Sequence, residues 1–76
     1  MTYYNIWAWK DAENPQRPDC REMKFHRDTA LSAGKHLADR YSLVEVEQVE
    51  APAHDLDAIE ATSLVRSWKN GIQQTK

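Results

Sequence analysis

The N-terminal segment Thr2–Trp9 has the residue pattern of a β-strand. It is rich in aromatic and β-branched residues and contains no Gly or Pro, which is the composition that strands prefer. Successive side chains of a strand point to opposite faces, so apolar side chains would lie on both faces. One face would carry Tyr3, Asn5, Trp7 and Trp9, and the other Tyr4, Ile6 and Ala8. The pattern predicts a central strand, or one that is covered on both sides.

A long loop and a second strand are predicted next. Residues 10–19 contain two prolines and show no periodicity, which is typical of a loop, and loops of this length tend to be functional or mobile. We therefore expect a mobile loop. Residues 20–26 alternate again, with Met23 and Phe25 on one face, and predict a short, half-exposed strand.

A helix is predicted to follow directly. Asp28 and Thr29 can cap its N-terminus, since a side-chain oxygen there accepts a hydrogen bond from a free backbone N–H group of the first turn. Small and apolar residues then recur at helical spacing. They are Ala30, Ala33, Gly34, Leu37 and Tyr41. Small residues along this stripe would allow the helix to lie close to a sheet.

Residues 43–49 return to a period of two and predict a third strand. In that strand Val44 and Val46 would face inward, while Glu45 and Glu47 would face solvent.

A second helix is predicted near the C-terminus. Asp57 and Glu60 have the spacing of a capping box at its start. The apolar residues that follow have a spacing close to 3.6 and would face the core. They are Ala61, Leu64, Val65, Trp68 and Ile72. Asn70-Gly71 would end the helix, because glycine adopts the left-handed conformation easily, and residues 73–76 would form a short tail.

Together these elements define an α+β fold in the order β-β-α-β-α. We expect residues 1–76 to form one small two-layer domain, in which a three-stranded sheet carries two helices on one face. A domain of this size buries only roughly 60% of the surface that its unfolded chain exposes. Pairing of two copies through the uncovered sheet face would bury more, which makes a twofold-symmetric homodimer an open possibility.

Composition excludes several classes of protein. The chain has a formal net charge of -2, which excludes the uniform basic field of histone-like proteins. No apolar run approaches the length of a membrane span, and no basic stretch leads into an apolar one as in a secretory signal. The single cysteine, Cys20, cannot form an internal disulfide, which fits a reducing compartment. We therefore expect a cytoplasmic protein that does not bind membranes.

Residues that could carry catalytic chemistry are few. The soft or imidazole ligands Cys20, His26, His36 and His54 are widely spaced along the chain, unlike the close ligand pairs of structural zinc sites. The two glycines are too few for a phosphate-binding loop or a nucleophile turn. The acids beside His54 are explained by helix capping. The sequence therefore predicts no catalytic residue, no metal and no cofactor, and a protein that is not an enzyme.

The most informative feature is a local excess of acidic residues. Residues 41–60 contain six Asp and Glu and no Lys or Arg. Such a surface suits a basic partner, for example a protein surface built to hold nucleic-acid phosphates, although charges of this kind also protect sheet edges from aggregation. An exposed Trp would anchor the interface. The candidate partner-binding residues are Glu45, Glu47, Glu50, Asp55, Asp57, Glu60, Trp7 and Trp9.

The leading functional hypothesis is a non-catalytic protein-binding module that occupies a surface of a larger protein or nucleoprotein complex. In size, acidity and mixed β-α order, the chain is similar to many phage-encoded accessory proteins, including small anti-CRISPR inhibitors, which share no common sequence motif. An inhibitor of a nucleic-acid-handling complex is the sharpest version of the binding-module hypothesis. One alternative is a single-stranded nucleic-acid-binding protein that uses Arg21, Lys24, Arg27 and exposed aromatic residues. Another is a small subunit of an oligomeric enzyme.

Overall fold

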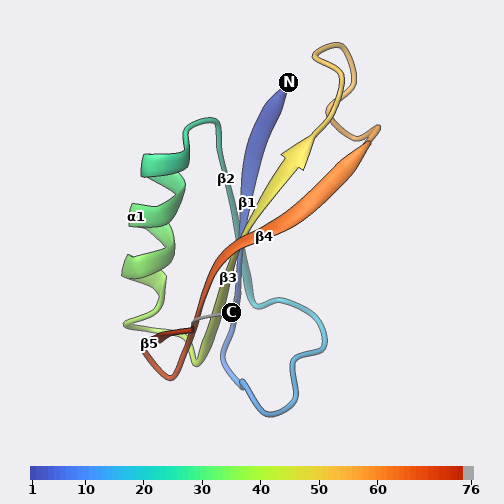
Figure 1. Ribbon diagram of the computed structural model, residues 1–76. Helices are drawn as coiled ribbons and strands as arrows, with labels where there is room; N and C mark the ends of the chain where they lie inside the picture. Colours follow the sequence, from blue (N-terminus) through green and yellow to red (C-terminus); the bar gives the residue numbers. More distant parts are fainter. Residues whose placement is uncertain (75–76) are drawn as a thin grey trace.

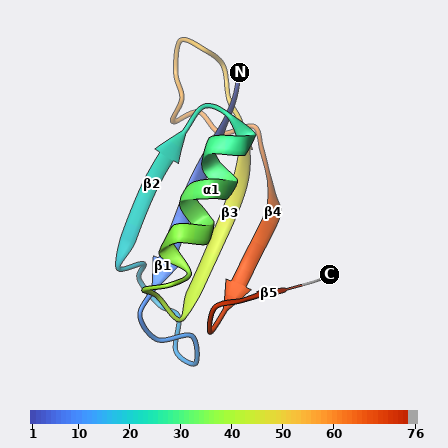
Figure 2. The same cartoon turned by 90° about the vertical axis from the view of Figure 1, so that its left-hand side faces the viewer.

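The computed structural model describes residues 1–74. These residues form a five-stranded antiparallel sheet with one helix packed on one face (Figure 1, Figure 2). The elements are β1 (Thr2–Trp9), β2 (Cys20–Lys24), α1 (Arg27–Leu37), β3 (Leu43–Glu50), β4 (Ala61–Lys69) and β5 (Ile72–Gln74). Their order in the sheet is β2-β1-β3-β4-β5. The predicted α+β sandwich of three strands and two helices is therefore wrong, because the described chain is mostly β.

The strands β1 and β3 form the middle of the sheet. β1 pairs with β2 on one side and with β3 on the other. All of its residues pair with β3, from Thr2 opposite Glu50 to Trp9 opposite Leu43. The prediction of a central first strand is confirmed, and so is the inward orientation of the two valines of the third strand, which are fully buried.

The predicted second helix does not form, and its residues make the hairpin of β4 and β5. Asn70 and Gly71 both have a positive φ, of 53° and 81°, and Lys69 pairs with Ile72 across them. Two residues with positive φ in a two-residue loop are the geometry of a type I′ turn, for which Asn-Gly is a preferred sequence. The dipeptide that was expected to end a helix therefore reverses the chain between two strands.

A β-bulge explains why the sequence of β4 resembles that of a helix. The register of β4 against β3 shifts between Val46 and Glu47. Arg66 and Leu64 lie opposite these two residues, which leaves Val65 as the extra residue of the bulge. The period of two is interrupted there, so the apolar positions imitate the spacing of an amphipathic helix.

The segment between β3 and β4 is a loop with local turns, so the predicted capping box of Asp57 and Glu60 is wrong. The backbone N–H of Asp57 donates to Oδ1 of Asp55 at 3.2 Å, a local turn that Asp favours. The Tyr3 hydroxyl donates to the carbonyl oxygen of Leu56 at 2.9 Å and holds the loop against the sheet. A small second core on this side consists of Tyr3, Val49, Ala51 and Leu56.

The helix α1 covers the other sheet face with its small residues. Its buried residues are Ala30, Gly34 and Leu37, and Ala33 is partly buried beside them. These four residues confirm the predicted stripe, but Tyr41 lies beyond the end of the helix and packs against the core from there. A Cβ atom on Gly34 would lie 2.7 Å from a ring carbon of Trp68 and 2.8 Å from a methyl carbon of Val46. The helix therefore lies so close to the sheet that only glycine fits at this position.

The ends of two predicted elements are corrected. The N-cap of α1 is His26, whose extended backbone leads in from β2, and no side chain caps the helix. Asp28 lies within the first turn instead, where its charge is favourable near the positive end of the helix dipole. At the other end, Gln73 and Gln74 of the predicted tail belong to β5, while residues 75–76 lie outside the described part of the chain.

The predicted loop at residues 10–19 is present and is closed at its base by hydrogen bonds. Oδ2 of Asp19 accepts a hydrogen bond from the backbone N–H of Lys10 at 2.8 Å. The indole N–H of Trp9 donates to the carbonyl oxygen of Gln16 at 3.3 Å. The mobility of this loop stays a prediction.

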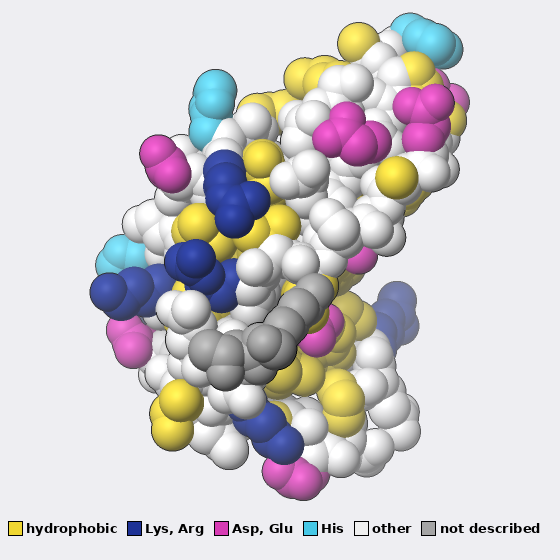
Figure 3. Space-filling model, viewed as in Figure 1, with side chains coloured by type: hydrophobic (Ala, Val, Ile, Leu, Met, Phe, Trp, Pro, Cys, Tyr) yellow, Lys and Arg dark blue, Asp and Glu magenta, His cyan; other side chains and the backbone are white. Residues whose placement is uncertain are grey.

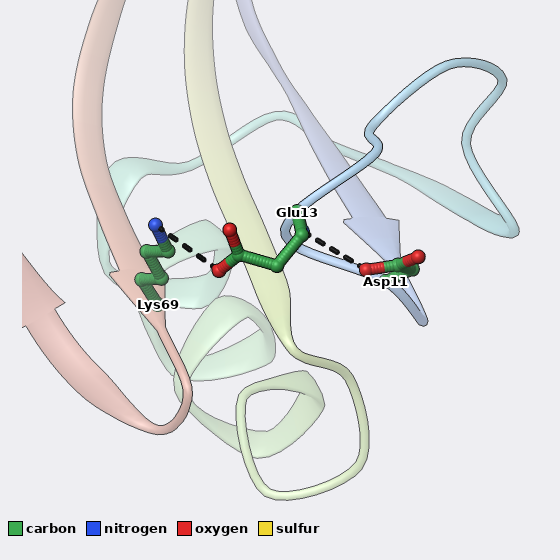
Figure 4. Close-up of polar contacts among 3 residues, drawn as sticks. All are labelled: Asp11, Glu13 and Lys69. Carbon is green, nitrogen blue, oxygen red and sulfur yellow. Dashed lines mark hydrogen bonds and ion pairs between the residues drawn. The ribbon is translucent and has the colours of Figure 1, made fainter.

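One side chain of this loop reaches across to β4. Glu13 forms an ion pair with Lys69 at 3.6 Å, and its backbone N–H donates to Oδ1 of Asp11 at 2.9 Å (Figure 4). Lys69 lies opposite Leu43, which in turn lies opposite Trp9. The loop therefore lies over one end of the sheet face that α1 leaves uncovered.

Candidate binding face

Among the described residues, no second helix covers the sheet face opposite α1. The loops after β1 and after β3 both bend toward this side, at opposite ends of the sheet (Figure 1). The space-filling view shows the surface hollowed between them (Figure 3). We define the open face by the strand side chains between and beneath these two loops, which are Asn5, Trp7, Trp9, Arg21, Glu45 and Glu47.

Trp7 and Arg21 form the aromatic and cationic part of the open face. They lie opposite each other on β1 and β2, and the guanidinium carbon is 5.2 Å from the centre of the indole ring. Nη2 of Arg21 also donates to Oδ1 of the buried Asn5 at 2.9 Å. A cation over an aromatic ring at an exposed site contributes about 0.5–1 kcal/mol. Sequence reasoning missed this cluster, although an amide inside an apolar strand signals a required hydrogen-bond partner.

Glu45 and Glu47 form the acidic part of the open face. Glu45 lies opposite Trp7 and Ser67, and Glu47 lies opposite Asn5. Both side chains are half-buried. Within residues 1–74, the ion pairs closer than 4.0 Å are Lys24–Glu22 and Lys69–Glu13, so neither Glu45 nor Glu47 has a cationic partner there.

The environment of Glu45 disfavours its ionised form. Burial raises the pKa of its carboxyl above the ordinary value, and the negative charge of Glu47 raises this pKa further. Both effects have the same sign, because desolvation and a neighbouring like charge each destabilise a carboxylate. A cation placed beside these two side chains would oppose both effects, because it favours the ionised form of the carboxyl.

Trp9 lies at the edge of the open face, beneath the loop that follows it. Its indole N–H is satisfied by the carbonyl oxygen of Gln16, and its side chain is half-buried. Trp7 is also half-buried, but Arg21 covers it rather than a loop. Of the two predicted anchors, Trp7 is therefore the one that lies beside the acidic pair.

The other four predicted acids lie away from Glu45 and Glu47. Glu50 lies opposite Thr2 on the alternate side of β3, and the Thr2 hydroxyl donates to its Oε1 at 2.5 Å. Asp55, Asp57 and Glu60 are exposed in the loop between β3 and β4. The structure thus divides the six acids into a pair on the open face and a group at one end of the sheet.

The cations of the nucleic-acid alternative lie on different surfaces. Arg21 belongs to the open face. Lys24 lies opposite Tyr4, on the side of α1, and forms an ion pair with Glu22 at 3.6 Å. Arg27 is the first residue of α1. The structure does not bring these three side chains onto one face.

The described residues contain few other features that bear on function. No three His, Cys, Asp or Glu side chains within residues 1–74 lie close enough together to hold a metal ion. No helix in that range has the length and apolar character of a membrane span. Cys20 is half-buried and packs against the main core. An open hollow of about 490 Å³ beside α1 is lined by acidic, basic and apolar residues, namely Glu22, Ala33, His36, Leu37, Asp39 and Arg40.

The fold and the open face together define a small, mostly β domain that presents a polar, Trp-containing sheet surface opposite its helix. No protein-family model, curated protein or solved structure matches this chain. The function is therefore inferred from the residues of the open face themselves.

Proposed function

We propose that the protein is a non-catalytic binding module whose open face docks on a basic surface of a larger protein. The observation that carries this proposal is the placement of Glu45 and Glu47 side by side on an uncovered sheet face, half-buried and without a cationic partner in residues 1–74. A Lys or Arg of the partner would meet two carboxylates that have already lost part of their hydration.

Two physical effects favour such a partner. Charges attract more strongly where water is partly excluded than in bulk solvent, and complementary charge also accelerates association. A cation beside Glu45 would stabilise its ionised form and lower its raised pKa. Trp7 adds a large, partly apolar surface next to the acids, and Trp is enriched among the residues that dominate binding energy.

A narrower version of this proposal makes the protein a cytoplasmic inhibitor of a nucleic-acid-handling complex. A surface that holds phosphates is basic, so Glu45 and Glu47 would occupy positions that phosphates otherwise take. A homodimer is proposed separately, through a sheet edge rather than through the open face.

The proposal can be tested by affinity capture from bacterial lysate with nuclease present and matched charge variants as bait. One bait carries Glu45→Gln and Glu47→Gln. The control carries Asp57→Asn and Glu60→Gln, which changes the net charge equally but in the loop beyond β3. We expect a protein partner that resists nuclease, is lost with the first variant and is retained with the control.

Two results would contradict the proposal. Equal loss with both variants would show non-specific attraction to negative charge, and loss with the control alone would move the site to the loop. If capture depends on nucleic acid, a gel shift with single-stranded DNA and RNA would test the alternative. Arg21→Gln should then reduce binding, because Arg21 and Trp7 are the cation and the ring that lie together.

A further inference from the structure

The free edge of β2 is self-complementary: two copies of this strand can pair antiparallel with opposite charges facing each other. β2 is the first strand of the sheet order and pairs only with β1 within the described residues, and it borders the sheet in Figure 2. An edge strand offers backbone N–H and C=O groups to another strand. Met23 in this strand and Phe25 directly after it are exposed large apolar residues, at 38% and 48%.

Symmetry restricts how two copies of β2 can pair. In a twofold-symmetric antiparallel pair, one residue must lie opposite its own copy. An axis at Arg21, Glu22 or Lys24 would place like charges directly opposite each other, which is unfavourable. An axis at Cys20, the first residue of β2, would pair the strand with the loop before it, where Pro18 has no backbone N–H to donate. An axis at Met23 places the uncharged Met23 opposite itself. It also sets Glu22 opposite Lys24 of the second copy, and Lys24 opposite Glu22 of the second copy.

We infer that the chain forms a twofold-symmetric dimer in which β2 pairs antiparallel with β2 of a second copy, centred on Met23. Glu22 and Lys24 already pair within one chain at 3.6 Å, half-exposed on the side of α1. In the dimer each of them has a further partner across the strands. Phe25, which directly follows β2, comes near Arg21 of the second copy, so the exposed apolar residues of this edge become contacts.

The dimer joins two five-stranded sheets into one continuous sheet. Its axis is perpendicular to the sheet, so both helices lie on one side and both open faces on the other. Each dimer would then present two copies of Glu45 and Glu47 on a single surface. A partner with two basic patches would bind more tightly to the dimer than to a monomer, because the second contact is intramolecular.

Charge exchange between two positions tests the register. Sedimentation equilibrium over a wide concentration range should show a reversible dimer of the unmodified chain. Glu22→Lys alone, or Lys24→Glu alone, places like charges opposite each other at two symmetric sites and should weaken dimerisation about tenfold or more. The double variant restores both pairs and should dimerise about as well as the unmodified chain. Far-ultraviolet circular dichroism checks that each variant is folded.

Cross-linking provides a second test that does not depend on charge. In a Cys20→Ala background, Met23→Cys places the new thiol opposite its own copy, within reach of a disulfide or a short bis-maleimide. The control, Arg21→Cys, lies on the same side of the same strand but away from the axis. We expect efficient cross-linking at position 23 and little at position 21. A chain that is monomeric at every concentration, a double variant that does not recover, or equal cross-linking at both positions would overturn the inference.

Discussion

Replacing Gly34 by alanine tests how closely α1 lies against the sheet. Helix propensity alone favours the change by about 0.5–1 kcal/mol, because glycine loses more backbone entropy than alanine when it becomes helical. The added methyl group, however, would lie 2.7 Å from Trp68 and 2.8 Å from Val46. Atoms cannot approach so closely, so either the helix moves away from the sheet or these two side chains move.

The surroundings of Trp68 and Val46 decide whether Gly34→Ala stabilises or destabilises the chain. Val46 is fully buried and Trp68 is 6% exposed, so neither can turn into solvent to make room. Overpacking of a filled core costs about 1–3 kcal/mol. This cost exceeds the gain in helix propensity, and we expect Gly34→Ala to lower the free energy of unfolding by about 1–2 kcal/mol. In a domain of this size, that corresponds to a fall in Tm of roughly 4–16 °C.

Urea unfolding followed by far-ultraviolet circular dichroism measures this loss. Ser32→Ala, at an exposed position of the same helix, is the control and should be slightly stabilising. In a Trp68→Phe background the ring carbons nearest to Gly34 are removed, so Gly34→Ala should cost less by about 1 kcal/mol. If Gly34→Ala stabilises the chain as much as propensity alone requires, then α1 does not lie against Trp68 and the packing described above is wrong.

Three further predictions concern a turn, a charge and a loop. Gly71→Ala should destabilise the chain by about 1 kcal/mol in urea unfolding, because Gly71 has a φ of 81° that alanine adopts poorly. Because the pKa of Glu45 is raised, its carboxyl proton is held more tightly in the folded chain than in the unfolded chain. This group therefore lowers the free energy of unfolding as the pH rises above 4.5, the ordinary pKa of the carboxyl. Glu45→Gln should remove that fall and raise the free energy of unfolding at pH 7 by a few tenths of a kcal/mol, since the desolvation of the carboxylate and the repulsion by Glu47 are both lost; an unchanged pH profile would contradict this. Tyr3→Phe removes the hydroxyl donor to Leu56 and should cost about 0.5–1.5 kcal/mol, with faster proteolysis in the loop after β3 but not in the loop after β1.

The strands β1 and β3 could be predicted because burial and alternation agree in them. Ile6 and Val46 are fully buried, and their neighbours along each strand point to the other face. The segment 61–74 could not be predicted in the same way, because the bulge at Val65 breaks the alternation. Asn70-Gly71 is compatible both with a helix end and with a type I′ turn. The pairing with β3 decides between the two. The edge of β3 that faces away from β1 hydrogen-bonds to β4, and no local sequence pattern reveals this pairing.

The open face was predictable in part. The alternation of each strand places Glu45 and Glu47 on one side of β3, and Trp7 and Trp9 on one side of β1. That these sides coincide depends on the register, in which Trp7 lies opposite Glu45. Arg21 reaches Trp7 only because β2 folds back on β1, and no spacing in the sequence indicates that pairing.

The charges of the open face also decide what cannot bind there. Two copies stacked face to face would bring the Glu45 and Glu47 side chains of both into one desolvated interface, and juxtaposed like charges cost several kcal/mol. Trp7 alone would favour contact with many apolar surfaces. The two carboxylates favour partners that supply a cation, whereas Arg21, the cation of the same face in a second copy, is already engaged with Trp7 and Asn5. In the dimer that we propose, the contact lies instead at the edge of β2, where opposite charges meet in the register centred on Met23, and the open face stays accessible.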